Sequence, residues 1–234
     1  MSRYPQHGLF VVGTDTGVGK TYVAGQIAKV AVQRGKRVGV YKPVASGCCW
    51  RDDLLVSEDA VHLWEQASCP ATLERVCPQR FEAPLVPHRA AMEEGKQVDV
   101  GLLQRGLTSW TNRCDMVVVE GAGGLLSPLS DDSYVADLAV EFGYPLIVVA
   151  PNRLGVINQT LQTLMAARHH GPGLRVAAVL LNDVVPNPVD LSTTTNFSEL
   201  RDRCDVPIVC KLGYGESCPG DQVDWCGLAE CPEI

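Results

Sequence analysis

The sequence has no run of about 18 consecutive apolar residues, the length that a helix needs to cross a membrane. Its first residues, Met-Ser-Arg-Tyr-Pro-Gln-His, contain no long apolar segment of the kind found in export signals. Basic residues are also scarce, with 20 against 27 acidic ones and a formal net charge of −7. Because nucleic-acid phosphates require a basic face, this balance argues against such a partner. We therefore expect a soluble, cytoplasmic protein without a membrane or nucleic-acid partner.

The sequence also lacks any C-x-x-C pair, although it contains ten cysteines. That pair is typical of zinc and redox sites, and its absence disfavours both. Without an export signal, reduced thiols acting as small apolar side chains are the default interpretation. No spacing that indicates a metal site is found among the histidines His62, His88, His169 and His170.

The segment from Leu9 to Thr21 has the pattern of a buried strand, a glycine-rich turn and the start of a helix. Glycines at 13, 17 and 19 let backbone N–H groups approach an anion. Lys20 supplies a positive charge for the β- and γ-phosphates of a nucleotide. The Thr21 hydroxyl is placed to ligate the Mg²⁺ that accompanies those phosphates. The strict motif needs glycine at position 14, where this chain has threonine. A variant phosphate loop is predicted; the alternative is a flexible turn that binds nothing.

Strands and helices alternate along the rest of the chain, and 234 residues favour one large domain over two small ones. Strands are expected at 37–41, 115–120, 145–150, 175–181 and 207–210. Helices are expected at 20–34, after Ser57, and at 98–112, 135–142, 157–168 and 196–203. Residues 68–97 read as an insertion of short pieces, and 213–234 as a tail that is partly ordered at most. The alternation requires crossovers, which predicts a single α/β domain over 1–234, a three-layer sandwich around a mostly parallel sheet.

Two further strands end in polar residues. The strand at 37–41 runs into Lys42-Pro-Val-Ala-Ser46-Gly47, and the apolar strand at 115–120 ends in Glu120, followed by Gly-Ala-Gly-Gly. A carboxylate in such a place needs a positive partner, and Mg²⁺ is the natural candidate given Thr21. Because the carboxyl ends of parallel strands meet at one edge, we expect these segments to converge with the phosphate loop.

Together these segments resemble the dethiobiotin synthetase family of P-loop NTPases. The resemblance rests on Gly13-Thr-Asp-Thr-Gly-Val-Gly-Lys-Thr21, Tyr41-Lys-Pro-Val-Ala-Ser-Gly47, Val119-Glu-Gly-Ala-Gly-Gly124 and Leu181-Asn-Asp183, in the family's order. The Lys-Pro-Val-x-Ser-Gly element is more specific than a phosphate loop alone. The family's loop has threonine at the position of Thr14, so the departure from the strict motif is accounted for.

The resemblance implies an ATP-dependent ring closure. In such a reaction 7,8-diaminononanoate, CO₂ and ATP give dethiobiotin, ADP and phosphate, by way of a carbamate and a mixed carbamic-phosphoric anhydride. Lys42 would hold the carbamate, Lys20 the phosphates, and Ser46 the carbamate or a substrate nitrogen. Mg²⁺ would be bound by Thr21, Asp59 and Glu120, although an acid at Asp59 can also simply offset a helix dipole.

The same resemblance assigns the remaining site residues. Asn182 would contact the adenine. The alternative is that Asn182 is only a turn residue without such a contact. The substrate carboxylate would lie at a helix start of a second subunit, at Gly155, Val156 and Asn158, which implies a homodimer. The full set of nucleotide contacts implied is Gly17, Val18, Gly19, Lys20, Thr21, Tyr22, Asp59, Glu120, Gly121, Ala122, Gly123, Asn182, Asp183, Lys211, Leu212 and Gly213.

Three other functions are alternatives to an ATP-dependent ring closure. A regulatory or partitioning ATPase of the same fold usually carries an additional early lysine in the phosphate loop, and residues 13–18 contain none. A cobyrinic-acid-type amidotransferase needs a glutaminase domain, for which 234 residues leave no room. A plain nucleotide-binding module is the third alternative.

Overall fold

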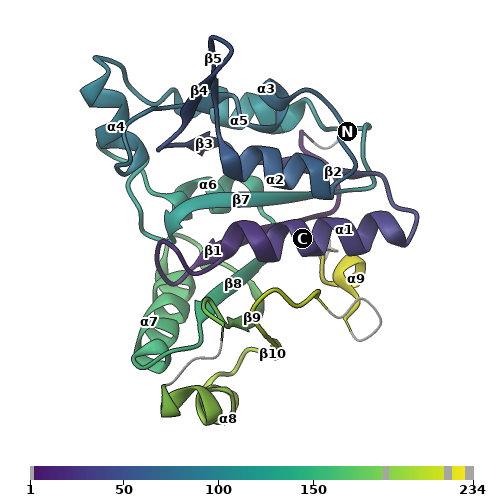
Figure 1. Ribbon diagram of the computed structural model, residues 1–234, viewed down its shortest axis with the longest axis vertical. Helices are drawn as coiled ribbons and strands as arrows, with labels where there is room; N and C mark the ends of the chain where they lie inside the picture. The colour runs from purple at the N-terminus through teal and green to yellow at the C-terminus, as the bar shows by residue number, and fades with distance from the viewer. Residues whose placement is uncertain (1–2, 187–189, 219–222, 230–234) are drawn as a thin grey trace.

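A six-stranded sheet forms the centre of the computed structural model, in the order β10-β9-β8-β1-β7-β2 (Figure 1). Every pairing in it is parallel. The structure describes residues 3–186, 190–218 and 223–229. The six strands are β1 (Gly8–Gly13), β2 (Val38–Tyr41), β7 (Met116–Gly124), β8 (Leu146–Pro151), β9 (Val176–Asn182) and β10 (Ile208–Leu212).

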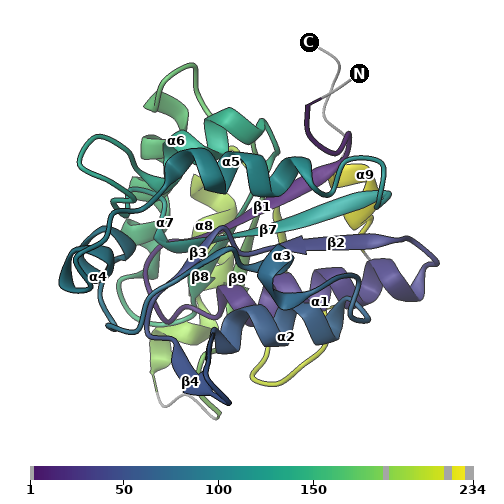
Figure 2. The same cartoon turned by 90° about the horizontal axis from the view of Figure 1, so that it is seen from above.

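Helices cover both faces of this sheet, which confirms the predicted α/β sandwich. Figure 2 shows α1 (Lys20–Gln33) and α2 (Glu58–Gln66) along one face, with α5 (Val100–Thr108) and α6 (Val135–Phe142) along the other. The two later helices are α7 (Val156–His169) and α8 (Asn196–Arg203). Ser57 caps α2 as expected, because its hydroxyl accepts a hydrogen bond from the Ala60 N–H at 3.3 Å. Most predicted boundaries fall within two residues of these bounds.

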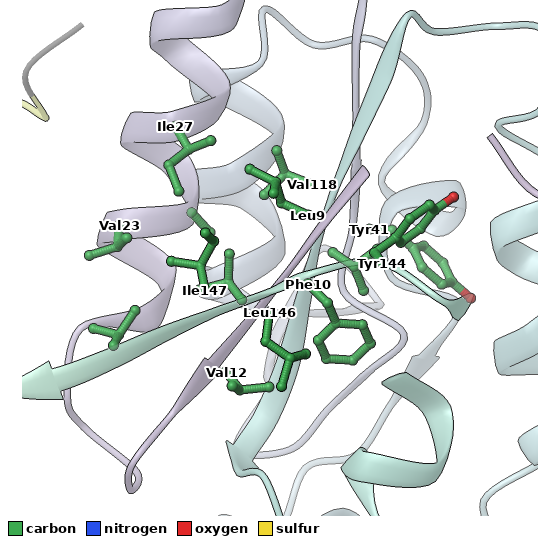
Figure 3. Close-up of a cluster of buried hydrophobic side chains, with 14 of the residues drawn as sticks. Leu9, Phe10, Val12, Val23, Ile27, Tyr41, Val118, Tyr144, Leu146 and Ile147 are labelled. Carbon is green, nitrogen blue, oxygen red and sulfur yellow. The ribbon is translucent and has the colours of Figure 1, made fainter. Parts of the chain in front are cut away.

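The core lies between the central strands and the helices on either side. Leu9 and Phe10 of β1, with Ile147 of β8, are fully buried, and Ile27 of α1 packs in the same cluster (Figure 3). Both faces of β1 are covered, which explains why its sequence is a continuous apolar run rather than an alternating one. This rigid centre holds the strand ends at which the polar residues lie.

The structure departs from the prediction at the glycines after Glu120. The strand was expected to end at Glu120, but β7 continues to Gly124, where it pairs with Gly13 of β1 after a shift in register. A second difference is the hairpin of β4 (Cys49–Arg51) and β5 (Leu54–Val56), which was not predicted. Its turn residues, Asp52 and Asp53, take positive φ without the glycine or asparagine that usually signals such a turn.

The insertion at 68–97 consists of short pieces, as predicted. These are α3 (Leu73–Val76), β6 (Gln79–Arg80) and α4 (Pro87–Glu93), and β6 pairs with β3 (Val44–Ala45). A short 3₁₀ helix, η1 (Leu191–Thr194), precedes α8. The last segment contains a further helix, α9 (Trp225–Ala229), whose Trp225 is fully buried; 219–222 and 230–234 lie outside the described residues.

The described ranges contain neither a membrane-spanning helix nor a disulfide. No helix there is long and apolar enough to cross a membrane. No disulfide joins any of the cysteines there, and Cys231 lies outside the ranges that the structure describes.

Candidate active site

The phosphate loop connects β1 to α1, and its last glycine is required by the local geometry. Gly19 caps α1 with φ of +90°, a value that side chains other than glycine rarely adopt. A Cβ there would also come within 2.2 Å of Asn182 Nδ2. The amino end of α1 therefore opens directly beside the loop, where its unpaired N–H groups and its dipole favour an anion.

A cavity of about 400 Å³ lies at this end of the sheet, and we call it the phosphate-side cavity. It brings together residues from the ends of three strands that are far apart in the sequence, as the sequence analysis expected. Its lining consists of Thr16, Gly17, Gly19, Lys20, Thr21, Lys42, Ala45, Ser46, Asp59, Glu120, Ala122 and Gly123.

Three charged groups, of which Lys42 and Glu120 are buried, lie in the wall of this cavity. Lys42 Nζ is 2.5 Å from Glu120 Oε1 and 3.1 Å from Asp59 Oδ2. The side chains of Lys42 and Glu120 are only 4% and 0% exposed. The Thr21 hydroxyl oxygen is 2.9 Å from both Asp59 Oδ1 and Glu120 Oε1. One lysine therefore lies between two carboxylates, both of which also contact the hydroxyl of the phosphate loop.

The pKa shifts follow from this arrangement. Burial would lower the pKa of Lys42, but the charges of Glu120 and Asp59 outweigh that effect and raise it, so the ammonium keeps its proton. Burial would raise the pKa of Asp59, yet Lys42 and the Thr21 hydroxyl hold it below its usual value. For Glu120, which is fully enclosed, burial prevails over the attraction of Lys42 and the pKa is raised.

Lys20 is the second buried cation of the site. Its Nζ donates a hydrogen bond to the Asp15 carbonyl oxygen at 3.0 Å, and the residue is 7% exposed. Burial, and then the nearby charge of Lys42, lowers the pKa of Lys20 to about 8. An anion placed between the two lysines would relieve their repulsion, which is a physical reason for this cavity to bind phosphate.

The oxygens of Thr21, Asp59 and Glu120 form a donor set that fits Mg²⁺. This hard ion prefers carboxylate and hydroxyl oxygens and usually keeps waters or phosphate oxygens in its remaining positions. The second oxygen of Glu120, Oε2, is buried and has no hydrogen-bond partner among the described residues. No group of three or more His, Cys, Asp or Glu that could hold a metal occurs in the same ranges. A metal here would therefore need ligands from a nucleotide or from water.

A second cavity, of about 330 Å³, lies on the other side of the phosphate loop, and we call it the base-side cavity. Asn182, at the end of β9, donates from Nδ2 to the Val18 carbonyl oxygen at 3.0 Å. This hydrogen bond engages one of the two N–H groups of Nδ2 and orients the side-chain amide. The cavity is lined by Gly17, Gly19, Tyr22, Asn182, Asp183, Val184, Tyr214 and Gly215.

The predicted residues at 211–213 lie beside this cavity without lining it. Lys211 Nζ is 3.6 Å from Asp183 Oδ2, Leu212 is buried in the core, and the Gly213 N–H donates to Glu216. Tyr214 and Gly215 line the cavity instead, and sequence reasoning missed them. The only available signal was their position directly after the last strand, because the segment has no periodic pattern.

The three residues at the start of α7 do not line either cavity. Gly155 caps that helix, Val156 is buried and Asn158 is exposed. Gln159, next to Asn158, lines a separate cavity together with Thr16 of the phosphate loop.

Several known proteins are similar to this chain over most of its length. A family model described as an AAA domain matches residues 7–220. A curated ATP-dependent dethiobiotin synthetase of Rhodopirellula baltica is 44% identical, over 87% of this chain and 82% of its own length. One from Aromatoleum aromaticum is 38% identical, over 86% and 87%. The solved structure of FlhF with GMPPNP and Mg²⁺ has a TM-score of 0.50 at 11% identity, covering 97% of this chain and 75% of FlhF, and shows a likeness of fold alone.

The buried pair of Lys42 and Glu120 should be strongly coupled in stability. Lys42→Gln leaves the Glu120 carboxylate buried beside an uncharged group, so we expect a loss of about 3 kcal/mol in the free energy of unfolding. The double variant with Glu120→Gln should lose clearly less than the two single variants together, by about 1–3 kcal/mol. Urea denaturation measures all four proteins; strictly additive losses would show that the two side chains do not act as a pair.

Proposed function

This chain belongs to the dethiobiotin synthetase family, as its motifs indicated, and we propose that it closes 7,8-diaminononanoate with CO₂ and ATP to dethiobiotin, ADP and phosphate. The observation that carries the proposal is the meeting of Lys20, Lys42 and Glu120 in one cavity at the end of the phosphate loop. The names of the curated relatives support the same reaction for this chain. The reaction belongs to biotin biosynthesis.

The central difficulty of such a reaction is electrostatic. One amine of the substrate adds CO₂ and becomes a carbamate, an anion that must then attack the γ-phosphate of a polyanion. Two fixed cations, Lys20 and Lys42, offset this repulsion in a partly enclosed cavity, where charges interact more strongly than in water. The mixed anhydride that results is closed by the second amine into a cyclic urea.

Each side chain of the phosphate-side cavity has a separate role in this proposal. Lys20 binds the phosphates, Lys42 holds the carbamate, and the Ser46 hydroxyl hydrogen-bonds the carbamate or a substrate nitrogen. Mg²⁺ held by Thr21, Asp59 and Glu120 would neutralise charge on the β- and γ-phosphate oxygens. Backbone groups of 121–123 line the substrate edge. No strong base is needed, because positioning and charge neutralisation account for the catalysis.

The base-side cavity would take the adenine of ATP. The hydrogen bond from Asn182 Nδ2 to the Val18 carbonyl orients the amide, and its oxygen would accept a hydrogen bond from the exocyclic amine of adenine. Tyr22 and Asp183 line the same cavity, and Lys211 is close to Asp183. We propose adenine as the base on the family resemblance together with this acceptor.

The assembly and location of the enzyme are further parts of the proposal. Gly155, Val156 and Asn158, which line neither cavity of their own chain, would bind the substrate carboxylate of a partner subunit in a homodimer, as the family resemblance implies. We further propose that residues 1–234 act as one domain, in the cytoplasm.

An assay of ATP turnover tests the reaction. Phosphate release should require both diaminononanoate and bicarbonate, and dethiobiotin should form in equal amount, detected by mass spectrometry. Omitting either substrate should reduce ATP hydrolysis to background, because only the carbamate is placed to attack the phosphate. Hydrolysis that continues at the same rate without both would contradict the proposed reaction and favour a regulatory ATPase.

Lys42→Gln should separate chemistry from nucleotide binding. The variant removes the cation proposed to hold the carbamate, so kcat should fall by roughly 100-fold or more. ADP affinity, measured by calorimetry, should stay near that of the wild type, because Lys20 and the phosphate loop are unchanged. The matched control is Lys29→Gln, an exposed lysine on α1. Near-normal turnover in the Lys42 variant would remove this residue from the mechanism.

Glu120→Gln should reveal the metal site. Loss of a carboxylate ligand weakens Mg²⁺ binding, so the Mg²⁺ concentration for half-maximal activity should rise by roughly 10–100-fold, the range seen when metal sites lose supporting groups. Glu58→Gln, an exposed acid in the first turn of α2, is the control and should leave the requirement unchanged. An equal requirement in both variants would argue against metal ligation by Glu120.

A further inference from the structure

A network of buried polar side chains lies beside the base-side cavity, and the proposed reaction gives it no role. Asn152 follows β8, Asp183 follows β9, and Asn196 begins α8. β8, β9 and β10 are neighbours in the sheet, so their carboxyl ends lie at the same edge (Figure 1). Asn152 and Asn196 are only 4% and 2% exposed. Side-chain amides at such depth are costly unless their polar atoms have partners, so this network requires an explanation.

The Asn152 side chain is held through both ends of its amide. Its Nδ2 donates to Asp183 Oδ1 at 2.7 Å and to the Thr193 carbonyl oxygen at 3.2 Å. Its Oδ1 accepts a hydrogen bond from Asn196 Nδ2 at 3.0 Å. The Asn152 backbone N–H donates to the Asn182 carbonyl oxygen at 2.7 Å, which joins the end of β8 to the end of β9. The amide cannot turn without breaking several of these hydrogen bonds at once.

Asp183 is the member of the network that reaches the base-side cavity. Its side chain is 12% exposed, and the residue is part of the cavity lining. Besides the contact with Asn152, Lys211 Nζ lies 3.6 Å from Asp183 Oδ2, and the Asp183 N–H donates to the Leu212 carbonyl oxygen at 2.8 Å. A carboxylate has about four lone-pair positions, so it can still accept hydrogen bonds from a ligand. The network therefore holds a hydrogen-bond acceptor in a fixed position at the cavity wall.

We propose that Asn152 is a positioning residue for base recognition, because it holds the Asp183 carboxylate where it accepts a hydrogen bond from the 6-amino group of adenine. This inference rests on the proposed function, which assigns adenine to the base-side cavity. The amino group has two N–H bonds, and the adjacent residues Asn182 and Asp183 each supply one acceptor. A base without that amino group leaves both acceptors without a donor, which is a strong source of discrimination.

A purely structural role for the network is the alternative. Asn196 Nδ2 also donates to the Arg153 carbonyl oxygen at 3.2 Å, and Lys211 Nζ donates to the Thr193 carbonyl oxygen at 3.4 Å, so the network joins the strand ends to η1 and α8. If it only did this, disrupting it would weaken the binding of every nucleotide by the same factor. A positioning role instead weakens the binding of an adenine nucleotide more than that of a nucleotide without the amino group.

Calorimetric titration with ADP and with purine riboside 5′-diphosphate measures this preference. The second nucleotide has a hydrogen atom in place of the 6-amino group and is otherwise identical. The wild type should bind ADP about 30-fold more tightly, and Asn152→Leu should reduce this preference about tenfold, the effect of one hydrogen bond to a charged group. The control is Thr160→Val, which removes a fully buried hydroxyl that has no hydrogen-bond partner in the described ranges. It should keep the wild-type preference.

A double variant shows whether Asn152 acts through Asp183. Asp183→Ala should itself reduce the preference about tenfold, and adding Asn152→Leu to it should cause no further reduction. In turnover with ATP, Asn152→Leu should raise KM and leave kcat within about twofold of the wild type, because the phosphate-side cavity is unchanged. Additive reductions in the double variant would show that Asn152 does not act through this carboxylate.

Asn196→Ser takes the place of Asn152→Leu if circular dichroism shows that the latter does not fold. It removes the donor to Asn152 Oδ1 and should reduce the preference by a smaller factor, about threefold. Equal weakening of both nucleotides in the folded variant, or an unchanged preference in Asp183→Ala, would overturn the inference and leave the proposed reaction standing. Equal binding of the two nucleotides by the wild type would contradict the proposed adenine site as well.

Discussion

The buried contact between the Lys42 ammonium and the Glu120 carboxylate is the interaction on which the rest of the site depends. Lys42 follows β2 and Glu120 lies in β7, and these two strands pair in register, with Tyr41 opposite Val119. The parallel sheet therefore places both charges at one edge and leaves them little freedom to move apart. A buried pair of this kind contributes little net stability, because removing both charges from water is costly. The pair instead acts by holding the Lys42 ammonium and the Glu120 carboxylate in fixed positions relative to each other.

The same contact shows how the free site stays balanced before any ligand arrives. With Lys42 between Glu120 and Asp59, two carboxylates share one cation, and the Thr21 hydroxyl lies within hydrogen-bond distance of both. In the proposed reaction these oxygens and this ammonium would turn to new partners, the metal ion and the carbamate. The cavity would then exchange one set of neutralised charges for another, with little reorganisation of the backbone.

Much of this fold could be predicted because its signals are local. Continuous apolar runs such as that of β1, and the Gly19-Lys20-Thr21 sequence at the start of α1, indicate their structures without any distant partner. The convergence of Lys42 and Glu120 with the phosphate loop also followed, since parallel strands must end at one edge. The β4–β5 hairpin was not predicted, because its turn, Asp52-Asp53, lacks the glycine that marks most two-residue hairpin turns. The burial of Trp225 and the role of Tyr214 depend on tertiary contacts that no short pattern encodes.

Gly17 and Gly19 border both cavities, so the phosphate loop acts as a partition between two halves of the sheet. β2 and β7 end at the phosphate-side cavity, whereas β9 and the segment after β10 end at the base-side cavity. The residues that line the two cavities have only Gly17 and Gly19 in common. Substitutions in the lining of one cavity can therefore leave the lining of the other unchanged. In the proposed reaction, substitutions around the base-side cavity would therefore change which nucleoside triphosphate is used and leave the ring-closing residues of the phosphate-side cavity as they are.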